Sequence, residues 1–135
     1  MFPPKRHLCL GDRATRRVQL SYAVVKRFAE LSGDTNPVHM EPAGGQIETV
    51  VHGALLNSLV SAVMGTKLPG PGCLVVRQTL EFPAACLSGD LVEVAVWLTA
   101  VRKLISAEFT VTAVARDVVV MRGTAQLVNK RHTTT

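Results

Sequence analysis

Residues 53–65, Gly-Ala-Leu-Leu-Asn-Ser-Leu-Val-Ser-Ala-Val-Met-Gly, predict a helix that is apolar around most of its circumference. The chain has no Asp, Glu, Lys or Arg from Thr49 to Thr66. We therefore expect other elements to enclose this helix on most sides. At 1.5 Å per residue it is only about 20 Å long, which is too short to cross a bilayer. The segment predicts a buried core helix and no membrane span.

Outward from this helix, five segments have the pattern of β-strands. We expect strands over residues 13–20, 73–82, 91–101, 104–116 and 118–129. Two of them alternate apolar and polar positions, with apolar sets Ile105, Ala107, Phe109, Val111, Ala113 and Val119, Met121, Ala125, Leu127. Short turns at 102–103 and 116–117 predict antiparallel pairing. The expected fold class is α+β, a hot-dog fold in which an antiparallel sheet of about five strands wraps around the central helix.

A second helix is expected before the central one. Ser21 is a candidate N-cap, and apolar residues at helical spacing continue to about Leu31. Gly33 then ends the helix. Residues 33–51 contain two prolines and three glycines, and they predict a loop with at most a fragment of helix.

Length and composition indicate one globular domain. The 135 residues, 47% of them hydrophobic, suffice for a single core. We expect an N-terminal extension over residues 1–9, a domain over 10–130 and a C-terminal tail over 131–135. The net charge of +5 suits anionic partners. The basic residues are dispersed, and only 4% of residues are aromatic, so we expect no nucleic-acid binding.

The cysteines and histidines carry little further signal. Cys9, Cys73 and Cys86 have no paired spacing, which argues against a disulfide scaffold and for a reducing compartment. The histidines lack the spacing of a common metal motif. Asp34, His39 and His52 form a possible ligand set, but we expect no metal. Residues 1–9 contain no apolar run typical of a secretory signal.

The segment from Phe28 to His39, Phe-Ala-Glu-Leu-Ser-Gly-Asp-Thr-Asn-Pro-Val-His, carries the chemistry. It places a carboxylate, Asp34, and an imidazole, His39, five residues apart. Such a pair can move protons near neutral pH. His52 and Gly53 then open the uncharged helix, whose free N–H groups can hold a negatively charged oxygen. The combination indicates an enzyme that adds water to, or removes it from, a carbonyl compound.

These motifs resemble the signature of the R-specific enoyl-thioester hydratases in the MaoC-like hot-dog group. The resemblance covers nearly the whole chain. Its matching motifs lie at residues 28–39 and 51–55, and also at 10–12, 65–73 and 82–84. Within the group, the chain is similar to the vertebrate mitochondrial hydroxyacyl-thioester dehydratases of type 2. The resemblance implies interconversion of (3R)-3-hydroxyacyl and trans-2-enoyl thioesters without a cofactor. The segment between His39 and His52 is shorter than in bacterial members, where it overhangs the substrate tunnel.

The resemblance also implies roles for single residues. Asp34 and His39 match the catalytic pair, and Asn36 matches the asparagine of the motif. Gly53 falls where the family offers a backbone N–H to the thioester carbonyl. On the same basis Ser61 lines the site and His52 belongs to the substrate-binding region. Taken alone, His52 could merely cap the helix or fix the loop, and Ser61 could merely pack.

Two other functions are compatible with the expected fold. One is a hot-dog acyl-thioesterase, and the other is a non-catalytic module that binds acyl thioesters. For all three functions the expected ligand is an acyl thioester on coenzyme A or acyl-carrier protein. The open edge of a single sheet and the resemblance together predict a homodimer. The resemblance implies a mitochondrial location and a role in fatty acid synthesis, with the cytoplasm as the alternative location.

Overall fold

The computed structural model describes residues 7–42, 44 and 47–130. The expected tail, 131–135, and most of the expected N-terminal extension lie outside these residues. The elements follow in the order β1 (Arg13–Gln19), α1 (Tyr22–Ser32), α2 (Pro37–Met40), α3 (Gly53–Thr66), β2 (Cys73–Glu81), β3 (Leu91–Val101), β4 (Ile105–Ala113) and β5 (Val118–Asn129). The strands form one antiparallel sheet in the order β1-β3-β4-β5-β2. This confirms the predicted α+β hot-dog fold.

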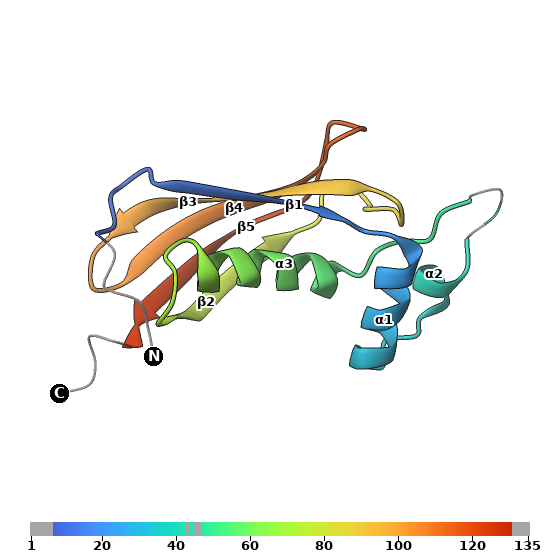
Figure 1. Ribbon diagram of the computed structural model, residues 1–135, viewed down its shortest axis with the longest axis horizontal. Coiled ribbons are helices and arrows are strands. Elements are labelled where there is room, and N and C mark those ends of the chain that lie inside the picture. The colour runs from blue at the N-terminus through green and yellow to red at the C-terminus, as the bar shows by residue number, and fades with distance from the viewer. Residues whose placement is uncertain (1–6, 43, 45–46, 131–135) are drawn as a thin grey trace.

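The apolar helix α3 lies along one face of the sheet, as Figure 1 shows. It buries five large side chains, Leu55, Leu56, Val60, Val63 and Met64. These pack in a common core with inward-facing residues of the strands, among them Val94 and Val96 of β3 and Phe109 of β4. Burying one such side chain stabilises the fold by about 1.5–3 kcal/mol. The helix is therefore held by the sheet, and none of the described helices has the length and hydropathy needed to cross a membrane.

One strand departs from the predicted alternation. On β4 the expected inward set from Ile105 to Ala113 is buried throughout. On β5, however, the pairing register shifts, because Val111 pairs with Met121 while Thr112 pairs with Val119. Val120 is therefore an extra residue in the strand, and its side chain is buried while Val119 is only partly buried. The prediction that Val119 faces the core was wrong, because a β-bulge reverses the alternation at this point.

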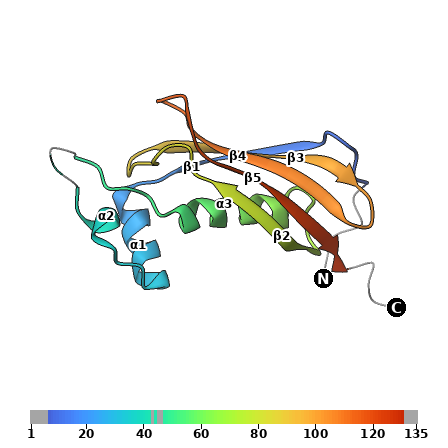
Figure 2. The ribbon, with the colours of Figure 1, turned by 180° about the vertical axis from the view of Figure 1, so that it is seen from behind.

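Helices α1 and α2 stand beyond one end of the sheet (Figures 1 and 2). Ser21 caps α1 as predicted, because its hydroxyl accepts a hydrogen bond from the Val24 N–H at 3.3 Å. Gly33 ends the helix in the left-handed conformation, with φ of 81°. A glycine adopts this conformation without a steric penalty. The chain leaves α1 directly into the segment that holds Asp34 and His39.

Two surfaces of the described fold carry exposed apolar or small side chains. One face of α3 is exposed and consists of small residues, namely Ala54, Ser58, Ser61 and Gly65. The edge strand β2 also exposes apolar side chains, with Leu74 50% and Val76 57% exposed. Strand β1 forms the opposite edge and carries arginines at positions 13, 16 and 17. Of the two edges, only β2 has the composition of a surface that pairs with another strand.

Candidate active site

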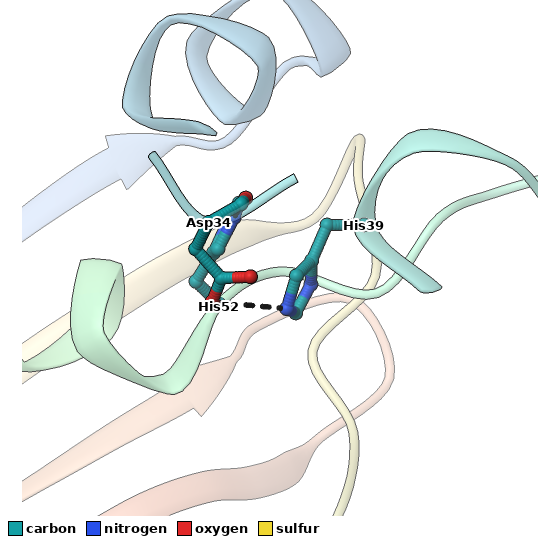
Figure 3. A group of neighbouring side chains, drawn as sticks. All are labelled: Asp34, His39 and His52. Atoms are coloured by element: carbon teal, nitrogen blue, oxygen red, sulfur yellow. Dashed lines mark hydrogen bonds and ion pairs between the residues drawn. The ribbon is translucent and has the colours of Figure 1, made fainter. Parts of the chain in front are cut away.

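A tight turn after α1 places the Asp34 carboxylate. The Asp34 N–H donates to the Ser32 hydroxyl at 3.1 Å, and Asp34 Oδ1 accepts the Asn36 N–H at 3.2 Å. These local bonds fix both the backbone and the side chain of Asp34. The other carboxylate oxygen, Oδ2, is directed toward His39 (Figure 3).

The short helix α2 places His39. Asn36 is its N-cap, because Asn36 Oδ1 accepts the Val38 N–H at 3.3 Å, and Pro37 takes the first helical position. His39 Nδ1 lies 2.7 Å from the Val50 carbonyl oxygen. A carbonyl can only accept, so Nδ1 carries the proton and donates it, which leaves Nε2 as the basic nitrogen. Through its side chain, Asn36 thus helps to position the short helix that carries His39.

The free nitrogen of His39 and the free oxygen of Asp34 face one another. His39 Nε2 lies 3.8 Å from Asp34 Oδ2, which is too far for a direct hydrogen bond. An oxygen atom of a water or a substrate hydroxyl can sit beside this gap within reach of both groups. The His39 side chain is 12% exposed and that of Asp34 is 52% exposed. The pair is therefore accessible to a ligand, as proton transfer requires.

His52 lies behind this pair and is buried, with an exposed fraction of 1%. Its Nε2 is 3.0 Å from the Asp34 carbonyl oxygen, so the ring donates to the backbone of Asp34. The ring stacks on His39 with centroids 3.7 Å apart and 22° between the planes. Phe28 of α1 contacts its edge at 5.0 Å. In the described fold His52 contacts both Asp34 and His39.

Asp34, His39 and His52 also form the possible metal-ligand set noted in the sequence. Their ligand atoms lie within 4.8 Å of one another. One nitrogen of each imidazole faces a carbonyl oxygen, and the two rings are stacked. Lone pairs in nearly parallel planes do not converge on one point, whereas zinc ligands converge at about 2.0–2.2 Å from the ion. The geometry suits proton transfer better than metal binding.

The start of α3 forms the rim of an adjoining cavity. His52 is the N-cap residue but makes no side-chain capping bond, so the first N–H groups of α3 have no such partner. A cavity of about 290 Å³ adjoins Gly53 and has mostly apolar walls, lined by His39, Val50, Val51, Gly53, Leu56, Phe82, Ala84, Ala85, Cys86 and Val120. A carbonyl oxygen at Gly53 and an apolar chain in the cavity are compatible with this arrangement.

Sequence reasoning gave a site role to His39 and Gly53 alone among the residues that line this cavity, and it missed Phe82 and Cys86 among others. The Phe82 ring lies against Gly53, and a Cβ on Gly53 would come within 2.7 Å of it. Cys86 is buried in the wall, and burial together with the nearby Asp90 carboxylate raises the pKa of its thiol to about 12. Such a thiol is a poor nucleophile. Both residues follow β2. Phe82 belongs to the matched motif 82–84 but had no expected role there, and Cys86 had no signal beyond the end of a strand at a proline.

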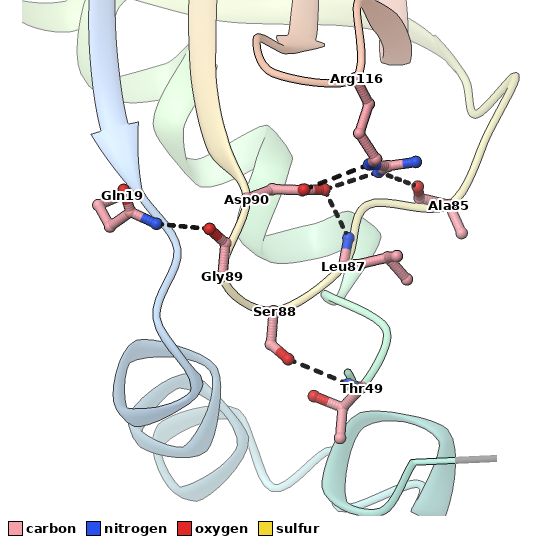
Figure 4. Close-up of polar contacts among 8 residues, drawn as sticks. All are labelled: Gln19, Thr49, Ala85, Leu87, Ser88, Gly89, Asp90 and Arg116. Atoms are coloured by element: carbon pink, nitrogen blue, oxygen red, sulfur yellow. Dashed lines mark hydrogen bonds and ion pairs between the residues drawn. The ribbon is translucent and has the colours of Figure 1, made fainter. Parts of the chain in front are cut away.

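A polar network holds this wall in place (Figure 4). Arg116 donates to both carboxylate oxygens of Asp90, at 2.6 and 3.3 Å, and to the Ala85 carbonyl. Burial alone would raise the pKa of the Asp90 carboxyl. The hydrogen bonds from Arg116 and from the Leu87 N–H outweigh burial and hold that pKa below its ordinary value of 3.8. Close by in the chain, the Ser88 hydroxyl accepts the Thr49 N–H at 3.0 Å, and Thr49 precedes Val50, whose carbonyl accepts from His39.

Replacing Asp90 by Asn should therefore destabilise the fold in a pH-dependent way. We expect the free energy of unfolding at pH 7 to fall by about 1–3 kcal/mol, as for a lost hydrogen bond to a charged group. Because the folded-state pKa is lowered, the stabilisation is complete above the ordinary value and disappears as the pH falls through the folded value. Urea unfolding of the parent and the variant at pH 7 measures the loss of unfolding free energy. The same measurement near pH 3 shows whether that loss becomes smaller.

A control for the Asp90 variant is Glu93→Gln, which removes an exposed ion pair with Arg17. Exposed pairs contribute about 0–1 kcal/mol, so this change should have little effect at either pH. An Asp90→Asn penalty that stays the same at low pH would contradict the assignment.

Ser61 and Asn36 are the remaining expected site residues. Ser61 lies two turns along α3 from Gly53, on the exposed face, and is not among the residues that line the cavity. Its expected role as a site-lining residue stays a prediction. Asn36 lies beside Asp34 but uses both its backbone and its side chain to build the turn.

The model of the MaoC like domain family matches residues 11–121. The chain belongs to this family. The match spans β1 to β4 with the start of β5, and also α3 and the Asp34–His39 segment. A 3-hydroxybutyryl-CoA dehydratase of Methylorubrum extorquens is 44% identical over 85 residues, which are 58% of this chain and 52% of that protein. An (R)-specific enoyl-CoA hydratase of Rhodospirillum rubrum is 34% identical over 116 residues, 81% of each protein.

Other similarities of this MaoC-like domain extend to structure and to a plant relative. The structure of an (R)-hydratase from A. caviae superimposes with a TM-score of 0.83 at 31% identity, over 90% of this chain and 96% of that chain. The mitochondrial 3-hydroxyacyl-[acyl-carrier-protein] dehydratase of Arabidopsis thaliana is 31% identical over 64% of this chain and 53% of that protein. The fluoroacetyl-CoA thioesterase FlK, at 15–16% identity, shares the fold alone.

Proposed function

We propose that the chain catalyses reversible water elimination and addition between (3R)-3-hydroxyacyl and trans-2-enoyl thioesters. One observation carries the proposal. His39 Nε2 and Asp34 Oδ2 lie 3.8 Å apart, beside an apolar cavity that contains the start of α3 in its wall. The dehydratases and hydratases among its relatives support the same reaction. Such an enzyme is a hydro-lyase.

In the dehydration direction, His39 is the base. Its Nε2 takes the proton from the carbon next to the thioester carbonyl, and the electron pair forms the carbon–carbon double bond. Negative charge that develops on the carbonyl oxygen is stabilised by the Gly53 N–H and by the positive end of α3. Asp34 orients the hydroxyl, which takes up the proton held on His39 Nε2 and leaves as water, so that the imidazole returns to its neutral form. Hydration follows the same steps in reverse, with the pair holding one water.

Hydration of crotonyl-CoA by the purified chain tests the proposal. We expect the enoyl absorbance to fall until equilibrium, with (3R)-3-hydroxybutyryl-CoA as the product. Release of free thiol without a change in enoyl absorbance would identify a thioesterase instead. Binding of enoyl-CoA without turnover would identify a non-catalytic module. Either outcome would overturn the proposal.

The proposed carrier of the acyl group is coenzyme A or acyl-carrier protein. Both attach the thioester to a phosphopantetheine arm and both are anionic, which suits the positive net charge of the chain. The relatives differ on this point, because two are named for coenzyme A thioesters and one for an acyl-carrier protein. The plant relative supports a place in fatty acid synthesis. Rates on matched acyl chains attached to the two carriers would distinguish them.

We also propose a homodimer in which two sheets join along β2. This strand bonds to β5 on one side, and its other edge has no partner strand in the described fold. Its exposed Leu74 and Val76, together with the small-residue face of α3, give an apolar surface beside that edge. The basic strand β1 is less suited to pairing, because like charges would face one another.

Light scattering tests this assembly. We expect a mass of twice 14.5 kDa for the parent chain at micromolar concentration. The double variant Leu74→Lys/Val76→Lys should be monomeric, because lysines on both copies of an edge oppose pairing. Thr15→Lys adds one lysine to the exposed β1 edge and should leave the dimer intact. An active parent monomer would refute the proposal.

The proposed location is the mitochondrion, with the cytoplasm as the alternative. Its support is the relative from Arabidopsis, which is named mitochondrial. Imaging a C-terminal fluorescent fusion of the whole gene product in its own cells would decide between them.

A further inference from the structure

The geometry points to His52 as a positioning residue that holds both members of the catalytic pair, an inference that rests on the proposed function. His52 makes two contacts that reach different members. Its Nε2–H donates to the Asp34 carbonyl at 3.0 Å, and its ring stacks on His39 at 3.7 Å. One buried side chain therefore connects the base to the backbone of the acid.

The two contacts restrain motions that other bonds leave free. The bond from His39 Nδ1 to the Val50 carbonyl fixes the rotation of the imidazole about its own axis. It does not prevent the ring from tilting away from Asp34, and the stacked His52 ring fills the space on one side. Phe28 in turn contacts the edge of His52. The alignment of His39 Nε2 with Asp34 Oδ2 is thereby fixed from within the core.

One further feature is difficult to explain if His52 only caps or packs. His52 is the N-cap residue of α3 but makes no side-chain capping bond. With Nε2 committed to Asp34, Nδ1 is buried and has no hydrogen-bond partner among the described residues. A buried nitrogen without a partner is destabilising, and a phenyl ring would avoid that cost. The donor function toward Asp34 is what an imidazole provides here and a phenyl ring does not.

Three substitutions separate the two contacts. His52→Phe keeps a stacked ring and loses the N–H donor. His52→Gln keeps an N–H donor at similar reach and loses the ring. His52→Asn loses the ring, and the N–H donors of its shorter side chain do not extend to the position of Nε2, so it loses both contacts. We expect each of the first two to lower kcat on crotonyl-CoA, and His52→Asn to lower it most, by about 10²-fold, as for a misaligned catalytic group. KM should stay within about threefold, because His52 is 1% exposed and is not among the residues that line the cavity.

A double-mutant cycle and a matched control distinguish positioning from simple loss of stability. Because His52 acts through the pair, His52→Asn should cost little further once His39 has been replaced by Gln. If His52→Asn only reduced the amount of folded protein, its loss of kcat would multiply with the loss caused by His39→Gln. The Tm of the His52→Asn variant would then also fall. His7→Gln, at an exposed site, should change neither kcat nor Tm. Unchanged kcat in His52→Asn, or additive losses that follow Tm, would overturn the inference.

Nitrogen NMR of the imidazoles tests the same idea without any activity. In the parent, His39 should show a single fixed tautomer with the proton on Nδ1. In His52→Asn its signals should broaden or average, while those of His7 stay unchanged. If the parent fails to hydrate crotonyl-CoA, the proposed function is wrong, and the spectra still decide whether His52 holds His39. An unchanged His39 spectrum in His52→Asn would refute the positioning role.

Discussion

Replacing Asp34 by Asn or His39 by Gln is expected to lower kcat/KM on crotonyl-CoA by about 10²–10⁴-fold, the usual effect of losing a general acid or base. His39→Gln removes the basic Nε2 that faces the substrate. Asp34→Asn removes a carboxylate oxygen that lies 3.8 Å from that nitrogen. Both sites are at least partly exposed, so the fold should be retained. Initial rates and Tm measured on each variant provide the check.

The double variant Asp34→Asn/His39→Gln and two control variants make this test more specific. Because the pair acts on one water, replacing both residues should cost little more than replacing the more important one. Asp117→Asn changes an exposed turn residue with φ of 50°, a conformation that Asn tolerates, and should leave the rate unchanged. His7→Gln serves the same purpose for histidine. If both active-site variants kept more than about half of the parent rate, the assignment of general acid–base roles would be wrong.

The helices and the sheet were predictable because their signals are local. The uncharged run after Thr49 predicted α3, and alternation on β4 predicted which face is buried. Ser21 and Gly33 marked both ends of α1. The bulge at Val120 was not predictable, because an extra residue changes the register with the neighbouring strand without changing the composition of β5. Periodicity alone cannot reveal a shift of one residue.

The pair of Asp34 and His39 was predictable from the sequence, but the contacts around the pair were not. The spacing of Asp34 and His39 and the resemblance indicated the pair, since a short turn and one helical turn join them. The stacking of His52 on His39 and the contact of Phe82 with Gly53 join residues that are distant in sequence. Which ring packs on which backbone depends on how α1, α3 and the segment after β2 meet. Those distances exist only in the folded chain.

Gly53→Val is expected to lower kcat/KM by about 10²–10³-fold, the usual effect of losing one donor to a developing oxyanion. The substitution leaves the Gly53 N–H in place, but its side chain blocks the approach of the thioester oxygen. The structure adds a second effect, because a Cβ at this position comes within 2.7 Å of Cε1 and 2.8 Å of Cζ of Phe82. Phe82 is 51% exposed, so its ring can swing outward and the fold should survive.

The double variant Gly53→Val/Phe82→Ala separates the two effects of Gly53→Val. Removing the Phe82 ring relieves the clash, so Tm should recover toward that of Phe82→Ala alone. Catalysis should stay low, because the valine side chain still covers the N–H at the start of α3. Comparing kcat/KM per folded molecule in the single and double variants measures this. If Gly53→Val lowers Tm but keeps normal catalysis per folded molecule, Gly53 is only the surface on which Phe82 packs. The oxyanion role would then be excluded.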